Sequence, residues 1–445
     1  MVHQQERFKG NVGNVEILKE KIQFRNGKVA LNRLMKSPMS EKIYNWEDPS
    51  EEKRGVPNQQ LVNLYEKWGF GGFGIIFLGN VVPDPKYIYE AGQGIVSREN
   101  DSSEMRNWYA KMARAAKANH SLAIAQINNP GAWALTSYTD NRGRVHKISD
   151  GVENPLEFDG EKLRSEVIGR LVYAAKLLSN CGFDGIEIMS AHGNLYSSFL
   201  LASNPRKDEY GGNRIENRAR LHVEIYKYIR KEIPAASGFL IGIKINSADF
   251  QNGYSDEDII KFCEIIETTG YDFVEITGGQ MEHVIKEENQ RSSTIAREDF
   301  FVKLIKMVTK VFSKTVVYIT GGWQTVGGMV DAVNLGITQG IGFARASAAE
   351  PNLARKLLTG QANAVLHNKF GPSDFMTSKH AAHFQMRSAA QSSIENVQSS
   401  TDGIPDFTNE KEANHFAEKA AEYMKHVGEN GKPDSFAETI SYKPL

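Results

Sequence analysis

Two polar side chains lie within apolar segments of the sequence. Because such segments are expected to be buried, these side chains are candidates for a chemical role. Gln126 lies in AQIN, and Lys244 is the charged residue of the apolar run IGIKIN. A buried lysine is costly unless it meets an anion or a polarisable acceptor. Lys244 therefore predicts either a bound ligand or a structural ion pair with Glu187 or Glu275. Both interpretations stay open at this point.

His192 follows the apolar segment GFDGIEIM in SAHGN, and of the eleven histidines it alone stands directly at such a segment's end. Imidazole titrates near neutral pH, so His192 is the best candidate for holding a substrate oxygen or transferring a proton. A histidine packed in a loop is the alternative. Neither an HExxH motif nor a clustered set of His, Asp and Glu predicts a metal site.

Glycines and one cation mark a further site near the end of the apolar segments. Gly321 and Gly322 belong to TGGW, and Gly342 belongs to GIGFAR, which ends at Arg345. Glycine lets backbone N–H groups approach phosphate oxygens, and arginine adds a bidentate contact of permanent charge. These residues predict a phosphate site. The alternative is that the glycines only form turns and that Arg345 makes a surface ion pair.

The elements that must position these residues alternate regularly. Eight short apolar runs are each followed by a longer segment with helical spacing of apolar residues. The predicted strands are 32–39, 72–81, 121–128, 182–189, 238–246, 271–278, 315–322 and 340–345. The predicted helices are 58–68, 103–118, 160–180, 215–233, 256–269, 299–312, 325–335 and 352–358. Ser102 and Ser255 are N-cap candidates. Eight such units predict an α/β fold, a (β/α)8 TIM barrel, because a doubly wound sheet rarely has eight units this regular.

The connections after predicted strands one, three, four and six are far longer than the roughly 2–6 residues usual for such loops. All four lie at the rim formed by the C-terminal ends of the strands, where barrel enzymes place their sites. An amide, a cation and a phosphate site around this mouth suit a ring that has donor and acceptor edges and carries a phosphate tail. Flavin mononucleotide (FMN) answers that description.

The composition excludes several classes of protein. The 445 residues carry a formal charge of −1 and are 40% hydrophobic, so no basic excess argues for nucleic acid. Cys181 and Cys263 lie in apolar segments, which predicts neither a disulfide framework nor a cysteine metal site. No signal-peptide core and no run near about 18 apolar residues is present. We expect a cytoplasmic protein without nucleic-acid or membrane partners; a homo-oligomer is not excluded.

Two further segments bear on the organisation of the chain. Residues 69–74 formally match G-x-G-x-x-G, but they end a predicted helix and open a strand, so a helix C-cap and tight turn is the better interpretation. From residue 361 onward the pattern stops, and polar segments mix with one amphipathic stretch, EANHFAEKAAEYMKHV. The predicted parts are an N-terminal segment (1–30), an FMN-binding barrel (31–360) and a C-terminal helical or irregular appendage that packs on the barrel (361–445).

A series of motifs, one per barrel unit, resembles the FMN-dependent old yellow enzyme family, also called NADH:flavin oxidoreductases. The motifs are SPMSE, GGFGIIFLGNV, AQIN, DGIEIMSAHGNLYSSFLLASNPRKDEYGGNRIENRAR, KINSADF, ITGGW and GIGFARA. The longest of them is particularly specific to this family. The resemblance runs in order from about residue 32 to residue 360. It implies non-covalent FMN, with NAD(P)H as the reductant.

The resemblance also implies roles for individual residues around the flavin. Ser40 would tune the ring near its C4 oxygen, and Gly79 would leave room for the ring. Gln126 would bind the pyrimidine edge, and Lys244 would stand at the N1/O2 side in place of the more usual arginine. A cation there is a general way in which a protein tunes this cofactor. The segment along the flavin would be Pro38, Met39 and Ser40. The phosphate would be held by Gly321, Gly322, Gly342 and Arg345.

The substrate side departs from the family pattern. Members usually present His with His or Asn at the positions of Met189 and His192, and a proton-donating tyrosine at the position of Asn194; here only His192 remains. The family's histidine-containing segment near the third strand reads NNPGAW, residues 128–133. One donor to a developing oxyanion is worth about 2.7–4 kcal/mol, so the usual ene reduction should be strongly impaired. Tyr196 is a candidate substitute acid, although packing in the loop is favoured.

The combined prediction is an FMN-dependent NAD(P)H oxidoreductase. It would pass hydride to an electron-poor small-molecule acceptor, such as an enone or a quinone, in an atypical site with His192 and Tyr196 as candidate catalytic residues. Two alternatives remain. One is a flavin-binding pseudo-enzyme or regulatory module with weak turnover. The other is a flavin-free barrel, such as a sugar-phosphate lyase that uses Lys244 as a Schiff-base amine.

Overall fold

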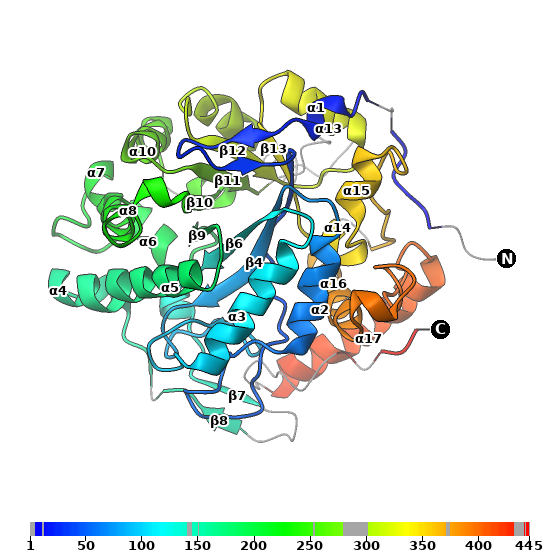
Figure 1. Ribbon diagram of the computed structural model, residues 1–445. Coiled ribbons are helices and arrows are strands. Elements are labelled where there is room, and N and C mark those ends of the chain that lie inside the picture. The colour runs from blue at the N-terminus through cyan, green and yellow to red at the C-terminus, as the bar shows by residue number, and fades with distance from the viewer. Residues whose placement is uncertain are drawn as a thin grey trace.

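Eight parallel strands close into a barrel in the computed structural model of the chain (Figure 1). Each strand lies within one of the predicted apolar runs or extends it by one residue. The barrel strands are β3 (Leu34–Lys36), β4 (Ile75–Val82), β6 (Leu122–Ile127), β9 (Gly185–Ser190), β10 (Leu240–Asn246), β11 (Phe273–Thr277), β12 (Val316–Thr320) and β13 (Gly340–Phe343). They pair in this order, and β13 pairs with β3 to complete the ring. The (β/α)8 prediction is confirmed.

The structure describes residues 5–10, 13–139, 145–149, 151–251, 254–278, 301–370, 374–430, 440 and 442–444. The predicted helix 299–312 begins outside this part of the chain, and residues 301–308 of it are helical. Most of the long connection after the sixth barrel strand, residues 279–300, also lies outside the described residues. The other three long connections fall within them wholly or in part.

Helices follow the strands on the outside of the ring. The described helices are α1 (Glu16–Lys19), α2 (Gln59–Gly69), α3 (Ser103–Ala116), α4 (Gly160–Lys162), α5 (Gly169–Asn180), α6 (Leu195–Leu200), α7 (Ile215–Arg218), α8 (Arg220–Glu232), α9 (Ser247–Gln251), α10 (Asp256–Thr269), α13 (Val326–Asn334), α14 (Arg345–Ala349), α15 (Leu353–Leu358), α16 (Phe375–Ala390) and α17 (Glu410–Asn430). Ser102 and Ser255 are N-caps as predicted, each accepting a backbone N–H at 3.1 Å.

Two predicted helices are interrupted. Residues 160–180 form α4, a π-helical segment η3 (Leu163–Ile168) and α5, and residues 215–233 form α7 and α8 with a boundary at Ala219. A π-helical turn is one extra residue inserted in the helical ladder, and it leaves the apolar spacing on which the prediction relied almost unchanged. The sequence therefore located these helical segments but not their interruptions.

The barrel is filled by apolar side chains and closed at its N-terminal end. One cluster joins the inward-facing Met35, Phe77, Leu240 and Phe273 to the hairpin of β1 (Ile22–Gln23) and β2 (Val29–Ala30). Phe24 of that hairpin meets Phe273 edge-on at 6.2 Å between ring centres. Residues 22–30 thus cover the bottom of the barrel and leave the opposite end for the long loops. A larger cluster lies between the strands and the outer helices.

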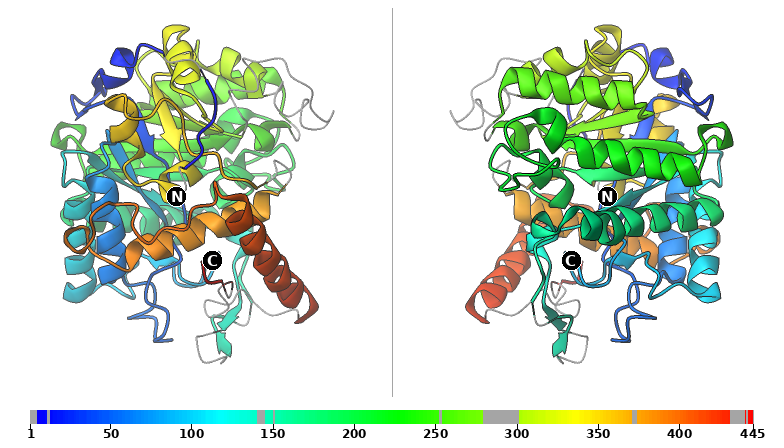
Figure 2. Two further views of the ribbon diagram at one scale, coloured as in Figure 1. Left: turned by 90° about the vertical axis from the view of Figure 1, so that its right-hand side faces the viewer. Right: turned by 90° about the vertical axis from the view of Figure 1, so that its left-hand side faces the viewer.

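The long loops gather at the C-terminal ends of the strands. The connection after β4, residues 83–102, is also long and carries β5 (Gly94–Ile95), which pairs with the end of β4. The connection after β6 carries η1 (Gly131–Trp133), the hairpin of β7 (Ser137–Thr139) and β8 (Val145–Lys147), and η2 (Pro155–Glu157). In Figure 2 this hairpin projects from the lower side of the molecule, the side on which α17 also lies.

The C-terminal residues add helices with their own small core. The predicted amphipathic stretch is α17, and Phe407, Phe416 and Tyr442 form an aromatic cluster with it. The orange α16 lies against the blue α2 in Figure 1, and α16 packs on both α2 and α14. The appendage with helical and irregular parts is therefore present; the exact division at residues 30 and 360 stays a prediction.

Candidate active site

A layer of polar side chains lies inside the barrel near its C-terminal mouth. Gln126 on β6 is in register with Glu187 on β9, and Lys244 on β10 is in register with Glu275 on β11. The Gln126 amide donates to Glu187 Oε2 at 2.6 Å, and Lys244 Nζ lies 3.1 Å from Glu275 Oε2. All four side chains are buried. Lys244 thus forms an ion pair with one of the two carboxylates that the sequence left open.

The buried carboxyl groups of Glu187 and Glu275 lie close enough for each to disfavour the charge of the other. Burial raises the pKa of Glu187 well above its ordinary value, the neighbouring Glu275 raises it further, and Lys244 opposes the shift. Glu187 Oε1 and Glu275 Oε1 have no hydrogen-bond partner among the described residues. The layer therefore holds one cation, one amide and carboxylate oxygens with unused hydrogen-bonding capacity, all facing the same mouth.

His192 stands at the mouth itself, directly after β9. Its ring is exposed to solvent, and its Nδ1 lies 2.6 Å from Nδ2 of Asn246, the last residue of β10. Desolvation by the surrounding chain, followed by the charge of Lys244, lowers the pKa of His192 to about 4. His192 adopts φ 62°, which is rare for a residue with a side chain and is found disproportionately at functional sites. His192 is therefore a neutral imidazole held in a specific orientation.

The other substrate-side positions present little chemistry. Met189 is half-buried at the end of β9, in register with Lys244. Asn194 is buried, and its Nδ2 donates to the Ala191 carbonyl at 2.9 Å. Asn129 caps the turn that follows β6 by accepting the Gly131 N–H at 2.9 Å. Neither amide carries an acidic proton.

Tyr196, the candidate substitute acid, is fully buried on α6 within the large apolar cluster. Burial raises the pKa of its hydroxyl, and the hydroxyl has no hydrogen-bond partner among the described residues. A tyrosine in this environment contacts neither solvent nor the open mouth. The placement favours the packing interpretation.

The residues expected along the flavin lie in the loop after β3. Pro38 is buried, Met39 and Ser40 are half-buried, and Ser40 Oγ accepts from Asn80 Nδ2 at 3.2 Å. Gly79 on β4 donates its N–H to Glu41 at 2.9 Å, and a Cβ at Gly79 would clash with the Met39 carbonyl. The missing side chain thus lets this loop lie directly against β4 and fixes Ser40 at the mouth.

The predicted phosphate residues lie at the ends of β12 and β13. Gly322 has φ 55°, and a Cβ at Gly342 would clash with the Thr320 hydroxyl. Gly321 precedes Gly322 in the same turn and is half-buried. Arg345 begins α14; its guanidinium donates to the Ser378 hydroxyl at 2.6 Å and stacks 5.6 Å from the centre of the Phe375 ring.

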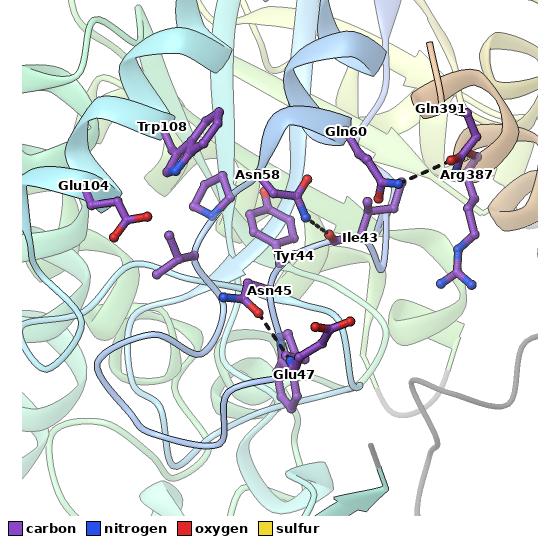
Figure 3. Close-up of a pocket in the computed structure, with 13 residues that line it drawn as sticks. Ile43, Tyr44, Asn45, Glu47, Asn58, Gln60, Glu104, Trp108, Arg387 and Gln391 are labelled. Carbon is purple, nitrogen blue, oxygen red and sulfur yellow. Dashed lines mark hydrogen bonds between the residues drawn. The ribbon is translucent and has the colours of Figure 1, made fainter. Parts of the chain in front are cut away.

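A separate pocket opens beside the barrel, as Figure 3 shows. It encloses about 650 Å³ between the N-terminal ends of α2 and α3 and the C-terminal end of α16, with Asn58, Trp108 and Arg387 among its lining residues. None of the residues that the sequence predicted for the site lines it. The chemistry-bearing residues therefore converge on the barrel mouth and not on this pocket.

Within the described ranges, no group of three or more His, Cys, Asp and Glu side chains is arranged to hold a metal ion. The two cysteines are buried and unpaired with each other. Among the described helices, none combines the length and the apolar character needed to cross a bilayer.

The sequence interpretation missed the residues that support His192. Asn246 contacts its ring, and the carboxylate of Asp249 lies near the backbone N–H groups of His192 and Gly193, which lower its pKa against the effect of burial. Both belong to KINSADF, a polar cluster immediately after a barrel strand. Polar side chains at that end of a strand were the available signal, because loops at this rim build the sites of barrel enzymes.

Known proteins resemble this chain in sequence and in fold. A family model described as "NADH:flavin oxidoreductase / NADH oxidase family" matches residues 20–363. The NADH-dependent flavin oxidoreductase nadA of Aspergillus parasiticus is 33% identical over 376 residues, which cover 80% of this chain and 82% of that protein. The NADH-dependent flavin oxidoreductase iliE of Hypocrea jecorina is 29% identical over 365 residues, covering 76% and 88%.

Solved structures with the same barrel include morphinone reductase and the old yellow enzyme from Trypanosoma cruzi. Morphinone reductase superposes with a TM-score of 0.60 at 15% identity and covers 80% of this chain and 92% of its own. The Trypanosoma cruzi enzyme gives a TM-score of 0.60 at 16% identity and covers 79% and 94%. At these identities the likeness concerns the fold.

Proposed function

Because the chain belongs to the NADH:flavin oxidoreductase / NADH oxidase family, we propose that its barrel mouth binds FMN on one side and an atypical acceptor on the other. The protein is an FMN-dependent oxidoreductase that takes hydride from NAD(P)H and passes it to an electron-poor small-molecule acceptor. The finer assignment of residues within the mouth is our proposal. The observation that carries it is the polar layer of Gln126, Glu187, Lys244 and Glu275 beneath that mouth.

The residues present fit the cofactor. An amide and a cation suit the pyrimidine edge of a flavin, and both amide atoms of the buried Asn128, two residues beyond Gln126, have no partner among the described residues. At the other end of the mouth, a Cβ at Gly342 would clash with the hydroxyls of Thr320 and Ser37, so this glycine lets β13 pack closely against its neighbouring strands. Arg345 supplies the charge that a phosphate requires.

The ring and the phosphate of the cofactor would then each contact particular residues of the mouth. Gln126 and Lys244 would hold the pyrimidine edge, and Ser40 would contact the ring from the loop after β3. The phosphate would be held by Gly321, Gly322, Gly342 and Arg345. FMN, when bound, supplies two-electron hydride chemistry between the nicotinamide and the acceptor.

On the acceptor side of the mouth, His192 would bind the acceptor. Its ring is neutral and solvent-accessible, so it can donate a hydrogen bond to an oxygen of the acceptor and stabilise the charge that develops there. Met189 adds no second donor. Asn194 cannot donate a proton to carbon, and Tyr196 is sealed in the core, so the proton that completes a reduction would come from water.

The earlier alternatives are disfavoured. The relatives are named as oxidoreductases, which does not favour a purely regulatory module. Lys244 Nζ lies 3.1 Å from Glu275 Oε2, and an amine engaged in an ion pair is a poor nucleophile, so a Schiff-base lyase is also disfavoured.

The test is direct. The purified protein should be yellow and release FMN on denaturation, and NADH or NADPH should bleach the flavin under anaerobic conditions. Re-oxidation by a quinone should be faster than by a simple enone, because one hydrogen-bond donor is available and no tyrosine acid. A colourless protein that does not take up FMN, or a flavin that neither nucleotide bleaches, would overturn the proposal.

A further inference from the structure

The turn that carries His192 has a strained backbone. His192 and Gly193 adopt φ 62° and φ 69° in succession, both in the left-handed region. For histidine this conformation is strained, and it persists only where surrounding contacts determine it. The turn must therefore be held from outside, and the holding contacts can be identified.

Two elements hold the backbone of the turn. The carboxylate of Asp249, on α9, lies near the backbone N–H groups of His192 and Gly193, which oppose the rise that burial causes in its pKa. On the other side, the Gly193 carbonyl accepts the indole N–H of Trp133 at 3.2 Å and the Ser198 hydroxyl at 3.1 Å. The two donors to the Gly193 carbonyl thus fix the backbone from which the imidazole projects.

A third contact fixes the ring itself. Asn246 Nδ2 lies 2.6 Å from His192 Nδ1. An amide nitrogen can only donate, so Nδ1 must accept and must carry no proton. In a neutral imidazole the single proton then resides on Nε2. Asn246 is the last residue of β10, two residues beyond Lys244, so the same strand that would meet the flavin also orients the histidine.

We propose that Asn246 is a positioning residue that holds His192 as the neutral Nε2–H tautomer and so aims this donor at the acceptor. The inference rests on the proposed function. His192 then serves as a fixed donor to an oxygen of the acceptor and not as a source of protons.

The charges around the ring are consistent with this role. The charged groups that face His192 are Lys244 from β10, Glu275 from β11 and Asp249 from α9. Lys244 disfavours a second positive charge, Glu275 favours it, and the carboxylate of Asp249 is turned to the backbone N–H groups. With partial burial the balance lowers the pKa of His192 to about 4, so the neutral form prevails above pH 5.

The decisive experiment reads the tautomer directly. Holoenzyme labelled with 15N-histidine should show the Nδ1 and Nε2 shifts of a neutral Nε2–H imidazole for His192, assigned by loss of the signal in His192→Ala. In Asn246→Asp the new carboxylate should draw the proton to Nδ1 and raise the pKa of the ring. An Nδ1–H tautomer in the unaltered enzyme, or an unchanged tautomer in Asn246→Asp, would overturn the proposal.

The pH dependence of kcat/KM gives a second measurement. It would not change in Asn246→Asp if Asn246 had only a structural role. Asn246→Ala should lower kcat/KM for a quinone roughly 10- to 100-fold, the usual loss when an orienting partner is removed. Asn246→Asp should be active at low pH, where the imidazolium carries both protons, and lose activity as pH rises through the raised pKa. The unaltered enzyme should show no such limb between pH 5.5 and 8.

Ser198→Ala is the matched control, because it removes one contact to the Gly193 carbonyl and leaves the Asn246–His192 contact in place. It should keep both the tautomer and a flat pH profile. Equal losses in Asn246→Ala, Asn246→Asp and Ser198→Ala, with the same pH dependence, would show that the turn merely needs packing. Failure of the proposed function would appear separately, as absent FMN or absent bleaching by NAD(P)H, while the tautomer would still be read by NMR.

Discussion

The flavin side and the acceptor side of the mouth are built in different ways. On the flavin side, buried side chains from adjacent strands pair with one another, as Gln126 does with Glu187 and Lys244 with Glu275. On the acceptor side, a single exposed histidine projects from a strained turn that is held by loop residues. Strand register decides which side chains of the first set face one another, whereas the second depends on contacts between separate elements. The acceptor side is therefore where function can diverge without disturbing the cofactor site.

The largest effect should come from breaking the flavin side. Lys244→Met would leave the carboxylate of Glu275, which is fully buried, without its cation. Removing one partner of a buried ion pair typically costs about 3–5 kcal/mol. We expect the unfolding free energy in urea to fall by that order and the purified protein to lose FMN.

Lys244→Arg is the matched control for this prediction, because it keeps the charge and should keep both stability and colour. If Lys244→Met were as stable as the unaltered protein and equally yellow, the ion pair would not be the structural centre of the flavin side, and the contrast between the two sides would lose its basis.

The next effect should come from rebuilding the acceptor side. Met189 is half-buried at the mouth, in register with Lys244, and Met189→His would place a second hydrogen-bond donor near His192. One such donor is worth about 2.7–4 kcal/mol in a preorganised site, roughly 100- to 1,000-fold in rate. We expect kcat/KM for a simple enone to rise toward this range, measured as re-oxidation of the reduced enzyme.

Met189→Leu should leave enone turnover unchanged, because it adds no donor. A gain with leucine would point to shape and not to hydrogen bonding, and the absence of a gain with histidine would place the acceptor oxygen elsewhere in the mouth.

The third prediction concerns a buried histidine that contacts the end of β9, the strand from which the His192 turn begins. His222, on α8, is fully buried and lies 2.9 Å from the Ser190 hydroxyl at the end of β9. Burial lowers its pKa to about 3, against about 6.5 in an unfolded chain. Between these values the unfolded state binds more protons than the folded state, so stability is present above pH 6.5 and is lost as pH falls toward 3.

The loss from this single group should be on the order of 2–3 kcal/mol between pH 6.5 and pH 4. It is measurable as the difference in pH dependence of urea unfolding between the unaltered protein and His222→Gln, which has no titrating ring. Parallel pH profiles for the two proteins would contradict the prediction.

The same contrast explains what could be predicted from the sequence. The eight strands and the N-caps Ser102 and Ser255 follow from periodicity and local hydrogen bonding, which neighbouring residues determine. From the sequence, an ion pair of Lys244 with Glu187 or Glu275 is one of two interpretations, and strand register selects Glu275. The contact of Asn246, at the end of β10, with the His192 turn after β9 joins two barrel units, and no periodic pattern records such a pairing.

The smallest effect should fall at the far end of the flavin side, where the phosphate contact is exposed. Arg345→Ala should weaken FMN binding roughly 10- to 100-fold, because a charge-assisted hydrogen bond contributes about 1.5–3 kcal/mol. Ser378→Ala removes only the hydroxyl that accepts from Arg345 at 2.6 Å, so its effect should be a few-fold at most. Titration of apoprotein with FMN at two salt concentrations measures both. The dissociation constant of FMN should also depend less on salt in Arg345→Ala, because salt screens the attraction between the phosphate and the arginine charge that this variant lacks. An unchanged dissociation constant in Arg345→Ala would separate Arg345 from the phosphate and leave the cofactor held by the buried polar layer alone.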